Sequence, residues 1–281
     1  MSLNTTPIAA DLLHRIRNPE RVQRIEQIGL LTGLRFQDGT YKKPNFERGL
    51  ILDWLVETRK PAQILELGTG RGLGAFAMSA AAETYGVTAS ILTLDYLASD
   101  FPQTWAIERE GKREVLTASR AEIWPKHLPE SWRTRISERC GPTTKLLNKL
   151  LREGRKFDLI FIDAGHDLCS VVSDLAHGMK LLAPGGCILM DDFAPAASFG
   201  ISTCIAYTHA RRFFEIAEVI PSEGLVYGDQ EIPGMPRNMV LLAKRKSEVS
   251  LRPWTLAFWK IAGKFVELAY RPDLFPARRS A

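Results

Sequence analysis

The feature that most constrains the fold is a repeated alternation of short apolar runs and helical stretches in the middle of the chain. Strands are expected at 63–67, 90–95, 135–139, 157–163 and 187–191, and helices at 73–84, 143–152 and 167–182. A strand, a helix and a further strand in this order form a right-handed crossover unit, and repeated units build a parallel sheet. The runs 159–162 and 187–190 contain no alternating polar residues, so both faces of the sheet are expected to be covered.

The chain after this alternation is expected to end the sheet differently. A helix is expected at 202–214, followed by strands at 215–220 and 238–244. The connection 221–237 is rich in Pro and Gly and has no room for a crossover helix, so these two strands are expected to be antiparallel neighbours. The predicted fold class is α/β, with a Rossmann-like, doubly wound, mostly parallel sheet of seven strands that ends in an antiparallel hairpin.

Further segments are expected around this sheet. Residues 1–60 are predicted to form an N-terminal helical cap, 61–246 the central domain with an insertion at about 97–132, and 247–281 an amphipathic helix and tail. The insertion carries Trp105, Trp124 and Trp132, which fit either a lid over a site or a surface addition that packs its tryptophans on the core. The apolar stripe of the C-terminal helix fits docking on this chain or a second copy, and also contact with a membrane surface.

Composition excludes several classes of protein. The chain has 281 residues, 45% hydrophobic and 25% charged, which is ordinary for a soluble globular protein. The net charge of +5 is too small to indicate a nucleic-acid partner, and no apolar run is long enough to span a membrane. The four cysteines are spaced singly, and the N-terminus does not resemble a secretory signal, so a reduced cytoplasmic protein is expected.

The first strand-to-helix turn is rich in glycine and follows Glu66. Glycines at 68, 70, 72 and 74 allow positive φ and a close approach of a ligand to the backbone. Asp95 ends the second strand, where an acid can bind both hydroxyls of a ribose. The alternative is a glycine turn beside a solvated strand-end acid. Glu66 would disfavour a pyrophosphate, whereas it suits a nucleoside with a cationic end, such as S-adenosylmethionine (SAM).

Three acids and a histidine follow the next two strands. Asp163 and His166 come after one strand, and Asp191 and Asp192 end the next. The carboxyl ends of parallel strands open onto one crevice, so these side chains are expected to converge with Glu66 and Asp95. Three close carboxylates repel one another unless a cation joins them, and oxygen ligands suit Mg²⁺ or Mn²⁺. The alternative is that Asp163 and Asp191 are ordinary strand-end acids and that Asp192 is solvent-exposed or a capping residue.

These motifs resemble a known family. The E-x-G-x-G-x-G turn, the later acid and the DLIFIDA, LLAPGG and DD series, within about 45–245, are similar to class I SAM-dependent methyltransferases. The likeness is greatest to small-molecule O-methyltransferases that need a divalent metal, of the catechol and caffeoyl-coenzyme A type and the macrolide-sugar type. It implies metal ligation, by Mg²⁺, at Asp163, Asp191 and Asp192, although many catechol-type members have Asn at the last position. It implies cofactor contacts from Glu66, Gly68, Thr69, Gly70, Gly72, Asp95, Tyr96, Gly141 and Asp163.

His166 occupies the position at which catechol-type members have a catalytic lysine and some sugar-type members a histidine. The resemblance implies that His166, beside Asp163, deprotonates a hydroxyl of a small natural-product, sugar or phenolic acceptor, which then attacks the sulfonium methyl group. The alternative is a loop histidine hydrogen-bonded to a neighbouring acid. Other functions left open are a metal-independent N- or RNA-directed methyltransferase, a nucleotide-dependent oxidoreductase and a cofactor-binding module without turnover. Homodimerisation is also left open.

Overall fold

The computed structural model describes residues 12, 16–37, 39–42, 46–195, 200–220 and 238–245. The predictions for the connection 221–237 and for the C-terminal helix and tail at 247–281 lie outside the described residues.

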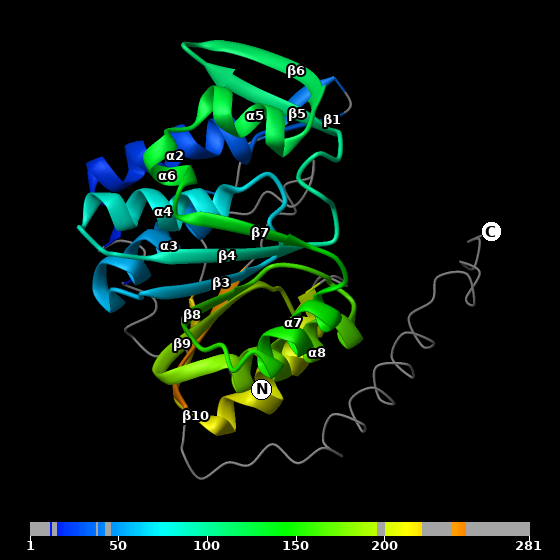
Figure 1. The fold of residues 1–281 in the computed structure, drawn as a ribbon. Coiled ribbons are helices and arrows are strands. Elements are labelled where there is room, and N and C mark those ends of the chain that lie inside the picture. Colours follow the sequence, from blue (N-terminus) through cyan, green and yellow to red (C-terminus); the bar gives the residue numbers. More distant parts are fainter. Residues whose placement is uncertain are drawn as a thin grey trace, which may run out of the picture.

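A seven-stranded sheet forms the centre of the molecule, in the order β10-β11-β9-β8-β3-β4-β7 (Figure 1). Five neighbouring strands are parallel, and β11 runs antiparallel to both β9 and β10. This confirms the predicted doubly wound sheet with its antiparallel ending. The strands are β3 (Gln63–Leu67), β4 (Ser90–Asp95), β7 (Ile136–Cys140), β8 (Phe157–Ile162), β9 (Leu182–Phe193), β10 (Phe214–Ile220) and β11 (Asn238–Arg245).

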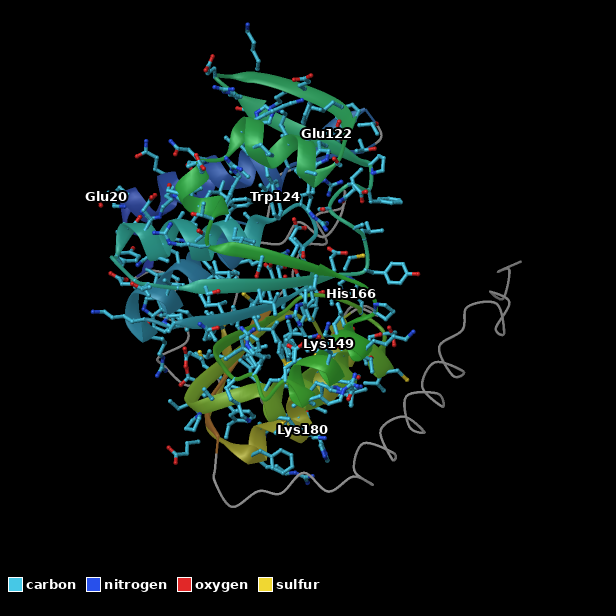
Figure 2. All side chains as sticks on the ribbon, in the orientation of Figure 1. Glu20, Glu122, Trp124, Lys149, His166 and Lys180 are labelled. Carbon is cyan, nitrogen blue, oxygen red and sulfur yellow. The ribbon has the colours of Figure 1, made fainter. Side chains whose placement is uncertain are left out.

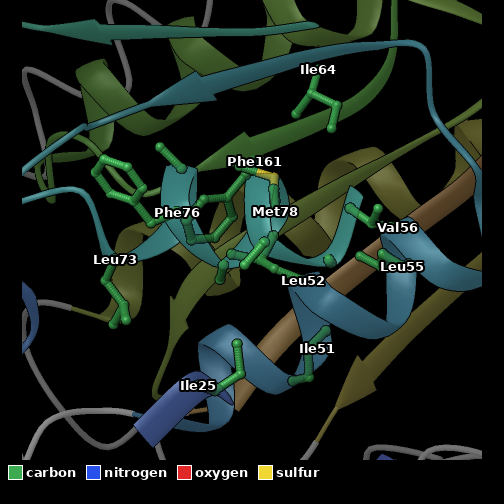
Figure 3. Packing of buried hydrophobic residues seen from close by; sticks show 14 of the residues in the cluster. Ile25, Ile51, Leu52, Leu55, Val56, Ile64, Leu73, Phe76, Met78 and Phe161 are labelled. Atoms are coloured by element: carbon green, nitrogen blue, oxygen red, sulfur yellow. The ribbon is translucent and has the colours of Figure 1, made fainter. Parts of the chain in front are cut away.

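Helices cover both faces of the sheet (Figure 1). Alternate side chains of β8 enter different apolar clusters, with Phe161 in one and Ile160 and Ile162 in the other. Figure 3 shows Phe161 in the first cluster with helix residues such as Leu52 and Phe76. Burial of each such side chain contributes roughly 1.5–3 kcal/mol. One face carries α2 (Pro19–Thr32), α3 (Phe46–Arg59) and α4 (Leu73–Thr84), and the other carries α7 (Thr143–Arg152), α8 (Leu168–Leu181) and α9 (Ile201–Ala210).

The N-terminal region contains the expected helices and also a small hairpin that the helical pattern did not predict. Strands β1 (Arg35–Gln37) and β2 (Thr40–Lys42) pair antiparallel between α2 and α3. Helix α2 begins where Asn18 caps it, the Asn18 Oδ1 accepting from the Arg21 backbone N–H at 2.8 Å. Arg21 and Arg24 then bind the buried Asp53 of α3, which fixes the two helices to each other.

The insertion forms a hairpin and two short helices at one end of the molecule: β5 (Gln103–Arg109), β6 (Lys112–Ala118), α5 (Arg120–His127) and α6 (Glu130–Arg133). Its three tryptophans pack inward, as the second interpretation of the insertion expects. Trp105 is fully buried, Trp124 meets Phe76 edge to face at 4.8 Å between ring centroids, and Trp132 packs at the edge of the same cluster. Trp124 is labelled in Figure 2.

The fifth parallel strand begins earlier than the sequence pattern indicates. Leu182 of β9 pairs with Phe157 of β8, but the next paired residues are Leu159 and Cys187. Residues 183–186 therefore bulge out of the ladder, with Gly185 at a φ of +78°. The Pro-Gly-Gly segment thus belongs to an irregular strand start that follows α8 directly.

Candidate active site

The glycine turn between β3 and α4 lies directly against the end of β8. A Cβ atom on Gly68 would lie 2.1 Å from the Asp163 carbonyl oxygen, and Gly68 has a φ of +95°. A Cβ atom on Gly74 would lie 2.2 Å from the Glu66 carboxyl oxygen. Glycine is therefore required at both positions for close packing, and at Gly68 for backbone conformation as well.

Glu66 lies beneath the turn rather than at an open surface. Its side chain is buried, and the Thr93 hydroxyl donates to Oε2 at 2.6 Å. Thr69 extends this contact, since its hydroxyl lies 2.6 Å from that of Thr93. Burial raises the pKa of the Glu66 carboxyl to about 8, with Asp163 nearby adding to the rise. The expected contact of an ionised Glu66 with a cationic ligand stays a prediction, because burial favours the protonated form of this carboxyl.

Asp95 lies beside the glycine turn, as expected for the ribose-binding acid. Its Oδ2 accepts from the Gly70 backbone N–H at 2.9 Å, and its Oδ1 accepts from the Leu97 N–H at 2.8 Å. The backbone of Gly141, at the end of β7, donates to the Asp95 carbonyl oxygen at 2.8 Å. Tyr96 is 74% exposed at the same edge. The sequence-predicted cofactor residues of β3, β4 and β7 are thus brought together.

Arg120 is a residue of this edge that the sequence analysis missed. It belongs to the insertion, is fully buried and donates to the Gly70 carbonyl oxygen at 3.0 Å. Its Nη1 also lies 3.4 Å from Asp95 Oδ2. Ser119 and Glu122 form a capping box that fixes the start of α5, and Arg120 follows the cap. The S-x-x-E pattern could have located this helix start, although not the contact with Gly70.

The acids of β8 and β9 meet a second arginine that the sequence analysis missed. Arg48 of α3 pairs with Asp163 through Nη1, and its Nη2 lies 3.1 Å from Asp191 Oδ2. The Asp191 side chain also accepts from the Asp192 backbone N–H at 2.8 Å. The guanidinium therefore lies between two of the three acids that were predicted to bind a metal.

The third acid pairs with the predicted base. His166 Nδ1 lies 2.7 Å from Asp192 Oδ2, and the histidine side chain is half exposed whereas Asp192 is buried. Asp192 has a φ of +64°, which is unusual for a residue other than glycine. Asp163, His166, Asp191 and Asp192 all line one cavity, and Figure 2 labels His166 at this end of the sheet. The predicted convergence of these four side chains is therefore observed.

The arrangement does not fit the expected divalent metal. The Asp163 and Asp191 oxygens that would bind a metal already bind the Arg48 guanidinium, and Asp192 binds His166. Within the described ranges, no three His, Cys, Asp or Glu side chains are grouped so that they could hold a metal ion. Magnesium ligation by Asp163, Asp191 and Asp192 therefore stays a prediction without support from this geometry.

The match to known proteins covers this same region. Residues 65–193 match the family model described as a methyltransferase domain, and they include the glycine turn, Asp95 and the acids of β8 and β9. Over these residues the chain is similar to a methyltransferase domain. The sheet has five parallel strands followed by an antiparallel pair, which is the architecture that the sequence resemblance predicted.

Solved structures share the fold of this chain at low sequence identity. The O-methyltransferase TomG from Streptomyces achromogenes, involved in tomaymycin synthesis and solved in complex with SAM, is 15% identical, with a TM-score of 0.51 over 87% of this chain and 100% of TomG. The O-methyltransferase from Bacillus cereus, in complex with SAH, is 16% identical, with a TM-score of 0.51 over 84% and 98%. Cofactor-bound Rv0187 from MTB is 16% identical, with a TM-score of 0.52 over 86% and 100%.

A comparison with curated proteins gave no match. In the part of the chain that the structure describes, no helix combines the length and the apolar character needed to cross a bilayer.

Proposed function

We propose that this methyltransferase transfers the methyl group of SAM to a hydroxyl oxygen of a small molecule, with His166 as the base. The observation that carries the proposal is the contact between His166 and Asp192, 2.7 Å long, in a cavity that also contains Asp163. The structural similarity to O-methyltransferases crystallised with SAM or SAH supports the choice of cofactor and acceptor atom. Natural-product, sugar and phenolic hydroxyls are the acceptor classes that we expect.

The glycine turn and the strand ends beside it are the proposed cofactor site. Asp95 would bind the ribose, and the Gly68, Thr69, Gly70 and Gly72 backbone would allow the cofactor to approach closely. Tyr96 and Gly141 would contact the adenine side of the cofactor, and Glu66 and Asp163 the methionine side. Bound SAM supplies an electrophilic methyl group on a sulfonium. The contact between Gly68 and the end of β8 brings this site next to the cavity of His166.

His166 has the chemistry and the support that a general base needs. Asp192 orients the imidazole through Nδ1, so Nε2 is the atom that would take the proton of the acceptor hydroxyl. The Asp192 carboxylate then stabilises the imidazolium that forms. The oxyanion attacks the methyl carbon in line with the departing sulfur, and the new C–O bond forms as the C–S bond breaks. No step of this proposal uses a metal, because Arg48 lies between Asp163 and Asp191.

The experiment is transfer of an isotopically labelled methyl group from SAM to a panel of hydroxylated small molecules. We expect an O-methylated product, and a fall in rate of about 10²–10⁴-fold for His166→Ala, with SAM affinity retained. Asp192→Asn should lower the rate in the same direction. His177→Ala, a histidine of α8 whose Nδ1 contacts the Ser173 carbonyl oxygen, is the matched control and should keep the wild-type rate.

Two results would overturn this proposal. Full activity of His166→Ala would remove the histidine from its role as base. Methylation of nitrogen rather than oxygen across the panel would show that the acceptor class is wrong.

A further inference from the structure

We propose that Arg48 is the cation of the acceptor site, placed between Asp163 and Asp191 where a divalent metal would otherwise lie, and that methyl transfer here needs no divalent metal. The part concerning transfer rests on the proposed function. The part concerning metal binding stands on the geometry alone and is tested separately.

The guanidinium is well matched to the two acids. Asp163 follows β8 and Asp191 lies near the end of the neighbouring parallel strand β9, and Arg48 reaches them with different nitrogens, Nη1 and Nη2. A planar guanidinium is a rigid fork that stays charged at all physiological pH values. Its side chain is 13% exposed, so bulk solvent screens these contacts only partly. One side chain thus holds both carboxylates and offsets part of their mutual repulsion.

The position of Arg48 is set by the core and not by a loop. Arg48 lies in the first turns of α3, and its neighbour Gly49 packs so closely on α2 that a Cβ atom would lie 2.5 Å from the Ile25 side chain. Residues 50–52, directly after it, are buried in the same cluster. Rotation of the helix that withdrew Arg48 would break this packing. The packing of α3 therefore holds the positive charge of Arg48 at the carboxyl end of the sheet.

The rest of the acid cluster is also engaged. Asp192 binds His166, so the three acids predicted as metal ligands contact two basic side chains. A metal ion would have to displace the Arg48 guanidinium from Asp163 and Asp191 and leave a largely enclosed arginine beside a divalent cation. Arg48 acts through these two acids and is a positioning residue. Both carboxylates line the same cavity as His166.

The direct test is a titration of the full-length protein with Mn²⁺. Binding is measured by calorimetry and by the loss of the electron paramagnetic resonance signal of free Mn²⁺. We expect no saturable Mn²⁺ site in the wild type and one new site in Arg48→Ala. The double variant Arg48→Ala/Asp163→Asn should lose the new site. Arg17→Ala removes an arginine that pairs with Glu47, the residue next to Arg48, and should behave as the wild type.

Activity provides a second readout. Wild-type methyl transfer should be unchanged by excess chelator, and Arg48→Ala should lose about a hundredfold in rate because the acids lose their alignment. Arg48→Lys, which keeps the charge without the fork, should recover part of that loss. Circular dichroism of each variant checks that it is folded.

The outcomes separate the two proposals. Stoichiometric Mn²⁺ binding by the wild type that Asp163→Asn abolishes, or loss of wild-type activity in chelator, would overturn the inference while leaving O-methylation intact. Full activity of Arg48→Ala in chelator would overturn the positioning role. Absence of methyl transfer by the wild type, together with gain of a Mn²⁺ site in Arg48→Ala, would refute the proposed function and leave the metal-binding claim standing.

Discussion

At the scale of single residues, the candidate site combines positions that a sequence pattern can find with others that it cannot. Asp95, Asp163 and Asp191 end or follow strands of a parallel sheet, so their convergence follows from topology alone. Arg48 contacts Asp163 across 115 positions of sequence, and nothing in its local pattern on α3 distinguishes it from a surface arginine. Its role emerges only when the helix is packed against the sheet.

Glu66 shows the same limit in a different way. The sequence predicted that Glu66 lies at the ligand-binding turn. Its burial under the turn and its contact with Thr93 depend on the pairing of β3 with β4, which the local pattern does not specify. The pattern favoured an ionised side chain facing a ligand. Burial instead raises the pKa of this carboxyl to about 8.

This raised pKa predicts a pH dependence of stability. Between the ordinary value of 4.5 and about 8, folded Glu66 keeps a proton that the unfolded chain has lost, so the free energy of unfolding falls as pH rises. The residue should contribute a slope of about 1.4 kcal/mol per pH unit within that window. Glu66→Gln should remove the contribution, as measured by urea unfolding at several pH values from 5.5 to 7.5.

Asp174→Asn is the control for this measurement. Burial raises the pKa of Asp174 on α8 to about 7, so its contribution has the same sign and ends at a lower pH. The difference in slope between the two variants should appear above pH 7, where Glu66 still holds its proton. Equal slopes for the wild type and Glu66→Gln would contradict the burial argument.

At the scale of elements, the glycine turn and the insertion form one unit. Arg71 of the turn donates to the Thr104 carbonyl oxygen of the hairpin at 2.6 Å, and the Trp124 indole donates to the Arg71 carbonyl oxygen at 3.1 Å. The tryptophans of the insertion predicted burial, but no periodic pattern could say which surface they would cover. The hairpin β1–β2 was missed because three-residue strands are too short to show alternation.

Replacement of Gly68 by alanine tests how tightly the turn is packed. The new methyl group would meet the Asp163 carbonyl oxygen at 2.1 Å, and the positive φ adds backbone strain. We expect a loss of about 2–4 kcal/mol in the free energy of unfolding, together with weaker cofactor binding. Gly154→Ala has a similar positive φ, +66°, with no atom within 4 Å of the new methyl group, and should cost about 1 kcal/mol. Equal costs at the two positions would contradict the close contact between the turn and β8.

At the scale of the whole molecule, the alternation of strands and helices and the covering of both sheet faces were predictable because hydrophobic periodicity reports burial directly. The irregular start of β9 and the contacts of the insertion were not, since both depend on packing between distant segments. Solved O-methyltransferases at 15–16% identity agree with this result, because they share the fold while most side chains differ.

The central claim is that the carboxyl ends of β3 and β4 bind SAM, and calorimetric titration of the full-length protein with SAM tests it most directly. We predict one saturable site per chain, with affinity lowered about 10- to 100-fold in Asp95→Ala, because a charged hydrogen-bond acceptor is lost. Asp100→Ala, an exposed acid beyond the same strand, should bind as the wild type does. Absence of saturable binding, or wild-type affinity in Asp95→Ala, would contradict the account.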